Sequence, residues 1–203
     1  MVPYLAFEGD QFKVPDELCL NEGRTNRLYD QVSAWMSKIS PGIKIHATNE
    51  PLDNKAKLDI SYIGQRLKSA PFKPVNVGFG IPHVLPLVVL LLTANENGLI
   101  LIENPESHLH PMGQTAIADL ITAVANRGTQ IICESHSDHI INGIRVAIKN
   151  QRLPCKDLSI VFFEKDENQL TKTTEIAIDQ NGNLSEYPIG LLDEWGNLMA
   201  ELL

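Results

Sequence analysis

The hydrophobic positions between residues 99 and 134 follow two different spacings. Two short runs, Leu99–Ile102 and Gln130–Cys133, consist mainly of Ile and Leu, which is typical of strands in a parallel sheet that are covered on both faces. Between them, apolar residues recur every three or four positions over Met112–Arg127, and this spacing predicts an amphipathic helix. Strand, helix and strand in this order predict a βαβ unit with a right-handed crossover.

Acidic and polar side chains stand where each of these strands is expected to end. Glu103 follows the first run, and Glu134 follows the second. Because the carboxyl ends of parallel strands meet at one edge of a sheet, and ligands bind at that edge, we expect a functional site there. The candidate residues of this edge are Glu103, Asn104, Glu106, His108, His110, Glu134, His136, Asp138 and His139.

The segments before this unit predict a helix and a hairpin. Apolar residues at helical spacing over Asn26–Ile39 predict an amphipathic helix, which Pro41 ends. Alternation in Ile43–Thr48 and in Lys57–Ile63 predicts two antiparallel strands, with the turn inside Glu50–Lys55. The residues up to Glu22 carry no clear pattern.

A glycine-rich segment precedes a strongly apolar run. Gly78 and Gly80 flank Phe79, which indicates close backbone approach or positive φ. Pro82 fits the first turn of a helix, and because Val84–Leu92 is apolar on all sides, we expect that helix to be deeply buried. The free N–H groups and the dipole at such a helix start can bind an anion.

The carboxyl-terminal third predicts two helices and a second hairpin. Ser137–Lys149 has the spacing of a helix, with Asp138 at or near its N-cap. Leu158–Phe163 and Leu170–Ile178 predict antiparallel strands joined around Asn168. A last helix is expected over Ile189–Leu203. Its inward residues would be Leu191, Leu192, Trp195, Leu198 and Leu202.

The composition narrows the class of protein. With 203 residues, 43% of them hydrophobic, the chain can form one domain with a small appendage. Its net charge of −8 argues against a general nucleic-acid or membrane surface. Three unevenly spaced cysteines suit a reducing compartment, and the longest apolar run, Val84–Ala94, is too short to span a bilayer. We therefore expect a cytoplasmic protein that does not enter a membrane.

Several motifs together resemble the second half of an ABC-class ATPase core. Residues 99–103, LILIE, resemble the Walker B strand, and residues 104–111, NPESHLHP, resemble its exit and D-loop. Residues 134–139, ESHSDH, resemble the switch strand, and residues 76–86, NVGFGIPHVLP, resemble the signature segment. Residues 187–195, YPIGLLDEW, resemble the end of a short domain of unknown function found in some bacterial ATPases of this type.

The resemblance implies a role for each motif residue. Glu103 would hold Mg²⁺, and His136 would contact the γ-phosphate of ATP. The position of the usual water-polarising glutamate is Asn104, and an amide orients water without accepting its proton. Either Glu106 takes that role, or turnover is slow and the protein is mainly a nucleotide-gated switch. Asn76, Gly78 and Gly80 would contact the nucleotide of an opposite subunit, although Pro82 and His83 depart from the Ser-Gln expected in the family.

The resulting fold class is α/β. We expect a mostly parallel sheet flanked by helices, a partial P-loop NTPase core with small antiparallel additions. The domain boundaries are a helix and hairpin region over residues 1–70, the ATPase-like lobe over 71–165, and a hairpin and helix appendage over 166–203. The family's relatives suggest a homodimer, and a link to DNA follows by analogy alone.

One motif of such ATPases is absent from the sequence. No G-x-x-x-x-G-K-[ST] segment, which cradles the α- and β-phosphates, occurs in the 203 residues. We therefore expect a carboxyl-terminal lobe that binds ATP weakly and hydrolyses none when alone, with its partner either a second copy or a separate amino-terminal lobe.

Two other functions stay open at this point. The histidines could ligate zinc or a pair of metal ions in a hydrolase, because they stand in two closely spaced pairs, His108 with His110 and His136 with His139. Alternatively, the chain is a non-catalytic interaction module derived from an ATPase.

Overall fold

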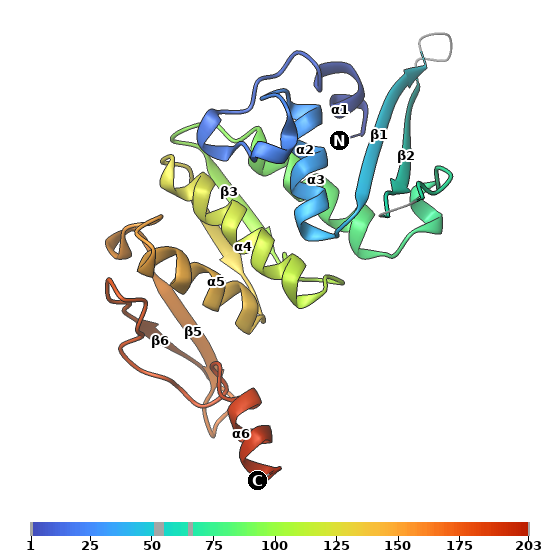
Figure 1. The fold of residues 1–203 in the computed structure, drawn as a ribbon. Coiled ribbons are helices and arrows are strands. Elements are labelled where there is room, and N and C mark those ends of the chain that lie inside the picture. The colour runs from blue at the N-terminus through green and yellow to red at the C-terminus, as the bar shows by residue number, and fades with distance from the viewer. Residues whose placement is uncertain (1, 51–54, 65–66, 203) are drawn as a thin grey trace.

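The structure is a computed structural model that describes residues 2–50, 55–64 and 67–202. It confirms a mixed α/β fold, and its described strands form three two-stranded sheets, one parallel and two antiparallel. The elements are arranged as Figure 1 shows. In chain order they are α1 (Val2–Glu8), α2 (Leu28–Ile39), β1 (Ile43–Glu50), β2 (Lys55–Tyr62), α3 (Gly80–Leu92), β3 (Leu99–Glu103), α4 (Pro111–Asn126), β4 (Gln130–Glu134), α5 (Asp138–Lys149), β5 (Ile160–Lys165), β6 (Thr171–Ile176) and α6 (Glu194–Glu201).

The amino-terminal region contains the helix and the hairpin that the sequence predicts, and one helix that it does not. Helix α2 and the antiparallel pair β1–β2 are confirmed, with Ile43 opposite Tyr62 at one end of the hairpin. The residues of the expected turn, 51–54, lie outside the described part of the chain. Helix α1 was not predicted, because only one of its side chains, Leu5, is buried.

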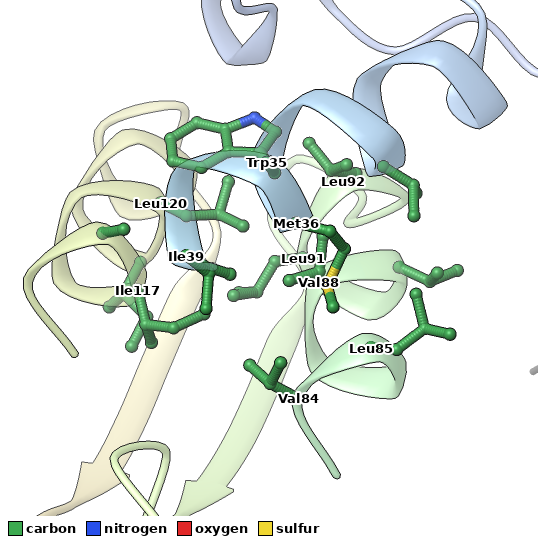
Figure 2. Packing of buried hydrophobic residues seen from close by; sticks show 14 of the residues in the cluster. Trp35, Met36, Ile39, Val84, Leu85, Val88, Leu91, Leu92, Ile117 and Leu120 are labelled. Carbon is green, nitrogen blue, oxygen red and sulfur yellow. The ribbon is translucent and has the colours of Figure 1, made fainter. Parts of the chain in front are cut away.

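Three helices form the centre of the main hydrophobic core. In Figure 2, Trp35 of α2 extends over Leu120 of α4, and Met36 of α2 extends toward Val88 of α3, and all four belong to one buried cluster. The indole N–H of Trp35 donates a hydrogen bond to the carbonyl of Leu18, 2.9 Å away, so the one polar atom of this side chain is satisfied. The same cluster contains residues from Leu5 to Ile140, so the first seventy residues and the motif-bearing region share one core.

The parallel pair is covered on one face only. Ile100 and Ile102 of β3 are buried under the helices, whereas Leu99 and Leu101 are 58% and 68% exposed. On β4, Ile132 is likewise 56% exposed. The prediction that both faces are covered is wrong for this reason. A continuous run of Ile and Leu is typical of a strand covered on both faces, but in this structure no described element lies on the outer face.

Helix α3 is also covered on one side only. Leu85, Val88 and Leu92 are buried, but Leu90 is 41% exposed and Pro86 also faces solvent. The expectation of a helix buried on all sides is therefore wrong. Pro86 lies inside the helix on this exposed side. Proline has no N–H group and so cannot donate the usual backbone hydrogen bond of a helix, and here the missing bond lies away from the core.

The carboxyl-terminal unit has a small core of its own. Ile176, Leu184 and Leu191 form it, with Ile141 of α5 packed against them. The turn between β5 and β6 is the predicted one, and the carboxylate of Asp166 accepts hydrogen bonds from the N–H groups of Asn168 and Leu170.

Helix α6 is shorter than expected, since it begins at Glu194. Leu191 is buried as predicted, but Leu198 and Leu202 are 53% and 78% exposed, so their predicted inward placement is wrong. The side chain of Trp195 lies outside the described part of the structure. None of the described helices has the length and hydropathy needed to cross a bilayer.

Asp119 connects helix α4 to helix α2 and to the segment that follows α5. The carboxylate of Asp119 on α4 accepts hydrogen bonds from Lys38 on α2 and from Arg152 after α5, each at 2.9 Å. We expect Asp119→Ala to lower the free energy of unfolding by about 1 kcal/mol in urea denaturation, and by less at high salt, which screens such pairs. Asp10→Ala is the control, because Asp10 lies 3.8 Å from Arg27 and is mostly exposed. Equal losses in the two variants would contradict the prediction.

Candidate functional site

The carboxyl ends of β3 and β4 meet at one edge, as the sequence predicts. The two strands are parallel, with Ile102 opposite Cys133 and Glu103 opposite Glu134. The N–H of Asn104 donates to the carbonyl of Glu134 at 3.0 Å and so extends the pairing by one residue. Because residues that pair in register share a face, the two glutamates lie side by side on the uncovered face at its polar end.

This pair of carboxylates offers part of the donor set that a divalent cation needs. Both side chains are exposed, and carboxylate oxygens are ligands of the kind that Mg²⁺ prefers. Two adjacent like charges repel each other, and a cation between or beside them would relieve that repulsion. The chemistry of these two residues therefore fits a magnesium ion whose other ligands come from elsewhere. Glu134 was among the edge residues that the sequence predicted, but without a role.

A groove beside β3 leads to the same edge. It encloses about 280 Å³ between α3 and β3. Its walls are formed by Pro86, Leu87 and Leu90 of α3 and by Leu101 of β3, and Glu103 and Pro105 stand at one end of it. The uncovered apolar face of the sheet thus continues toward helix α3.

The loop after β3 folds back in two tight turns. The N–H of Ser107 donates to the carbonyl of Asn104, and that of Leu109 donates to the carbonyl of Glu106, both at 3.0 Å. Asn104 and His108 have φ values of +47° and +62°. Asparagine and histidine are both found in this left-handed conformation more often than most residues, and it is the conformation that the tight turns of this loop use.

Glu106 connects this loop to the loop after β4, residues 135–137, which we call the switch loop. One of its carboxylate oxygens accepts the backbone N–H of His136 at 2.7 Å, and the other accepts the hydroxyl of Ser135 at 2.9 Å. The His136 side chain is 77% exposed, and its Nε2 lies 3.6 Å from the Glu134 carboxylate. Glu103, Glu106, Glu134 and His136 therefore form one cluster at the strand ends.

Helix α5 begins with Asp138 next to the N-cap, within the prediction. Ser137 is the N-cap itself, and the Ser137 hydroxyl oxygen accepts the N–H groups of His139 and Ile140. Both residue types are good caps, so the local sequence does not discriminate between them. Gln114 of α4 adds a second connection, since its amide donates to the carbonyl of Leu109 and accepts the hydroxyl of Ser137. No pattern in the amino-acid sequence indicates this role of Gln114.

The start of helix α3 packs against the loop after β3. A Cβ atom on Gly80 would lie 2.4 Å from the carbonyl oxygen of His108, so glycine is required there for close approach. The His108 ring lies 5.4 Å from the ring of Phe79 and 5.8 Å from that of His83, between centroids. These contacts bring the glycine-rich segment, residues 76–86, together with the loop after β3, residues 104–111.

Asn76 and Gly78 precede this contact. Both are exposed, and Asn76 ends a short 3-10 turn, Pro74–Asn76. A Cβ atom on Gly78 would meet nothing within 4 Å, and its φ is not positive, so neither reason for glycine applies at that position. His83, which departs from the family pattern, is a contact residue of this segment through the His108 ring.

The four loop histidines do not come together as a metal site. His110 is the residue before α4, whereas His139 lies in the first turn of α5. Within the residues that the structure describes, no group of three or more His, Cys, Asp and Glu side chains could hold a metal ion. The geometry therefore does not support the metallohydrolase alternative.

The cysteine near the site is an unreactive thiol. Cys133 lies on the covered face of β4, where burial raises the pKa of its thiol to about 11, with further contributions from Glu106 and Glu134. Because the thiolate is the nucleophilic form, this group stays protonated and inert at neutral pH.

Comparison with known families identifies the larger part of the chain. Residues 3–142 match the model of a family described as "AAA domain, putative AbiEii toxin, Type IV TA system". The chain belongs to this AAA ATPase family. Residues 153–202 match a second model, described as a protein of unknown function (DUF3696). Among curated proteins there is no match to the chain.

Solved structures with the same fold come from SMC ATPases. One, from work titled "Structural biochemistry of ATP-driven dimerization and DNA stimulated activation of SMC ATPases", has a TM-score of 0.54 and 13% identity, covering 86% of this chain and 89% of that one. Another is an SMC head bound to the C-terminal winged-helix domain of ScpA, with a TM-score of 0.55 and 14% identity, covering 76% of this chain and 44% of that one. At these identities the likeness establishes the fold alone.

Proposed function

We propose that this AAA-family chain is the carboxyl-terminal lobe of an ABC-class ATP-binding protein. A second lobe, which carries the phosphate-cradling loop, must join it before ATP is bound tightly. That lobe is supplied either by a longer form of this polypeptide or by a separate one. The observation that carries the proposal is the uncovered apolar face of β3 and β4, which ends at the carboxylates of Glu103 and Glu134.

The uncovered face supports this proposal physically. Leu99, Leu101 and Ile132 expose apolar surface side by side on two strands whose outer edges are unpaired among the described residues. Contiguous exposed apolar surface marks an interaction site, and an unpaired strand edge accepts a further strand. A strand and a helix of the second lobe would cover the apolar surface and pair with the free strand edge. The phosphate-binding loop of that lobe would then lie at the same polar edge of the sheet.

The site residues then have distinct proposed roles. Glu103 would hold Mg²⁺, with Glu134 beside it, and the metal supplies neutralisation of the phosphate charge. Asn104 would orient the attacking water, and His136 would donate a hydrogen bond to the γ-phosphate. Asn76, Gly78 and Gly80 would face the nucleotide of an opposite subunit, so the proposal includes a homodimer in the assembled state.

The wider setting is also a proposal. The relatives of known structure include SMC ATPases whose activation is described as DNA-stimulated, which suggests a DNA-linked process for this chain by analogy. Its three free cysteines suit the reducing environment of the cytoplasm.

Titration with MgATP tests the proposal. We expect the chain alone to bind MgATP with a Kd of about 1 mM or weaker, and to bind it about a hundredfold more tightly with a lobe that contains G-x-x-x-x-G-K-[ST], because most phosphate contacts come from that loop. Isothermal titration calorimetry measures both affinities. A lobe whose loop lysine is replaced with alanine is the control. Micromolar affinity of the chain alone, or no gain from the intact lobe, would contradict the proposal.

A further inference from the structure

We propose that Glu106 is a positioning residue that fixes His136, and that it is not the proton acceptor of the reaction. This inference rests on the proposed function. It concerns the one residue of the cluster whose carboxylate joins the two loops at the strand ends.

The first step is the geometry of the Glu106 carboxylate. Both oxygens accept hydrogen bonds from the switch loop, one from the N–H of His136 and one from the hydroxyl of Ser135. A general base needs an oxygen directed at the water that it deprotonates. Here each oxygen already accepts one donor of the protein itself, 29 and 30 positions along the chain, so the switch loop sets the orientation of this carboxylate.

The second step is what these bonds hold in place. The switch loop, residues 135–137, is short, and the His136 ring is exposed. The bond from Glu106 fixes the His136 backbone, and Gln114 fixes the next cap residue, Ser137, by accepting its hydroxyl. The backbone that carries the His136 side chain is therefore held in place, while the ring itself stays exposed, with its Nε2 3.6 Å from the Glu134 carboxylate.

The third step is where the same loop leads. From Glu106 it runs to His108, whose carbonyl touches Gly80 and whose ring contacts Phe79 and His83 at the start of α3. Glu106 thus lies on a continuous chain of contacts between His136 and the glycine-rich segment. A change at either end reaches the other through this carboxylate.

Replacement by glutamine separates the two possible roles of Glu106. Glu106→Gln keeps the shape and can keep both hydrogen bonds, because its carbonyl can accept the His136 N–H and its amide can donate to the Ser135 hydroxyl oxygen. It cannot accept a proton. Glu106→Ala removes both functions. Glu167→Gln, in the exposed turn between β5 and β6, changes the charge equally and is the control.

The primary measurement is amide hydrogen exchange at His136 in the full chain, followed by NMR. We expect Glu106→Ala to speed this exchange by about tenfold, the effect of losing one hydrogen bond to a charged acceptor. Glu106→Gln and Glu167→Gln should stay within about threefold of the parent chain, which is less than the loss of one hydrogen bond. Unchanged exchange in Glu106→Ala, or equally fast exchange in Glu106→Gln, would overturn the inference.

A second measurement is ATP turnover after the chain is joined to a phosphate-binding lobe. We expect Glu106→Gln to retain turnover within about threefold, whereas loss of a general base costs about a hundredfold or more. Equal loss in the Gln and Ala variants would make Glu106 the proton acceptor and overturn the inference. If no assembly binds or hydrolyses ATP, the proposed function fails, and the exchange measurement still decides the positioning role.

Discussion

Replacing Ile102 with lysine is expected to unfold the chain, whereas the same replacement at its neighbour Leu101 leaves it folded. Ile102 is 6% exposed, and its side chain packs in the main core. Leu101 is 68% exposed on the opposite face of β3. Lysine at position 102 loses the buried side chain and places a charge in the core, at a cost of about 4 kcal/mol or more. Lysine at position 101 keeps its charge in water.

Urea denaturation followed by circular dichroism measures both effects. The free energy of unfolding of Leu101→Lys should lie within about 1 kcal/mol of that of the parent chain, as is usual for substitutions at exposed positions. It should also fail to gain MgATP affinity from an added phosphate-binding lobe, because a lysine would interrupt the apolar face that this lobe covers. If Leu101→Lys unfolds the chain, the outer face is covered in solution. If it stays folded and still gains ATP affinity from the lobe, the lobe docks elsewhere.

The contrast between these two neighbours explains how far the sequence predicts the fold. Helices α2 and α4 and the hairpin β1–β2 were predicted correctly, because their spacings encode which side of each element is buried. The run LILIE encodes no such choice, since both faces of the strand are apolar. The uncovered face of β3 therefore appears only when the neighbouring elements are placed.

The candidate site divides in a similar way. Glu103 and His136 were expected at one edge because strand direction and strand ends are local properties, and the structure brings them together through Glu134. The bonds from Glu106 to His136 and from Gln114 to Ser137 join residues 30 and 23 positions apart. They depend on how two loops fold over each other, which no spacing in the sequence indicates.

Gly80→Ala is expected to be the most damaging small substitution at the site, and Gly78→Ala, two residues earlier, is its matched control. A Cβ atom at position 80 would lie 2.4 Å from the backbone carbonyl oxygen of His108, which cannot rotate away as a side chain would. The same atom at position 78 would meet nothing within 4 Å. Gly80 is the first residue of α3, and alanine is the better helix former of the two, so any loss at Gly80 measures the contact itself.

We expect Gly80→Ala to lower the free energy of unfolding by about 2 to 3 kcal/mol, the usual cost of an overpacked contact, and Gly78→Ala to change it by about 0.5 kcal/mol or less. The loop after β3 should respond as well, because His108 has to move away from α3. Since Glu106 belongs to that loop, amide exchange at His136 should accelerate in Gly80→Ala but not in Gly78→Ala. Stability loss without any change at His136 would mean that the start of α3 and the switch loop are not connected through Glu106.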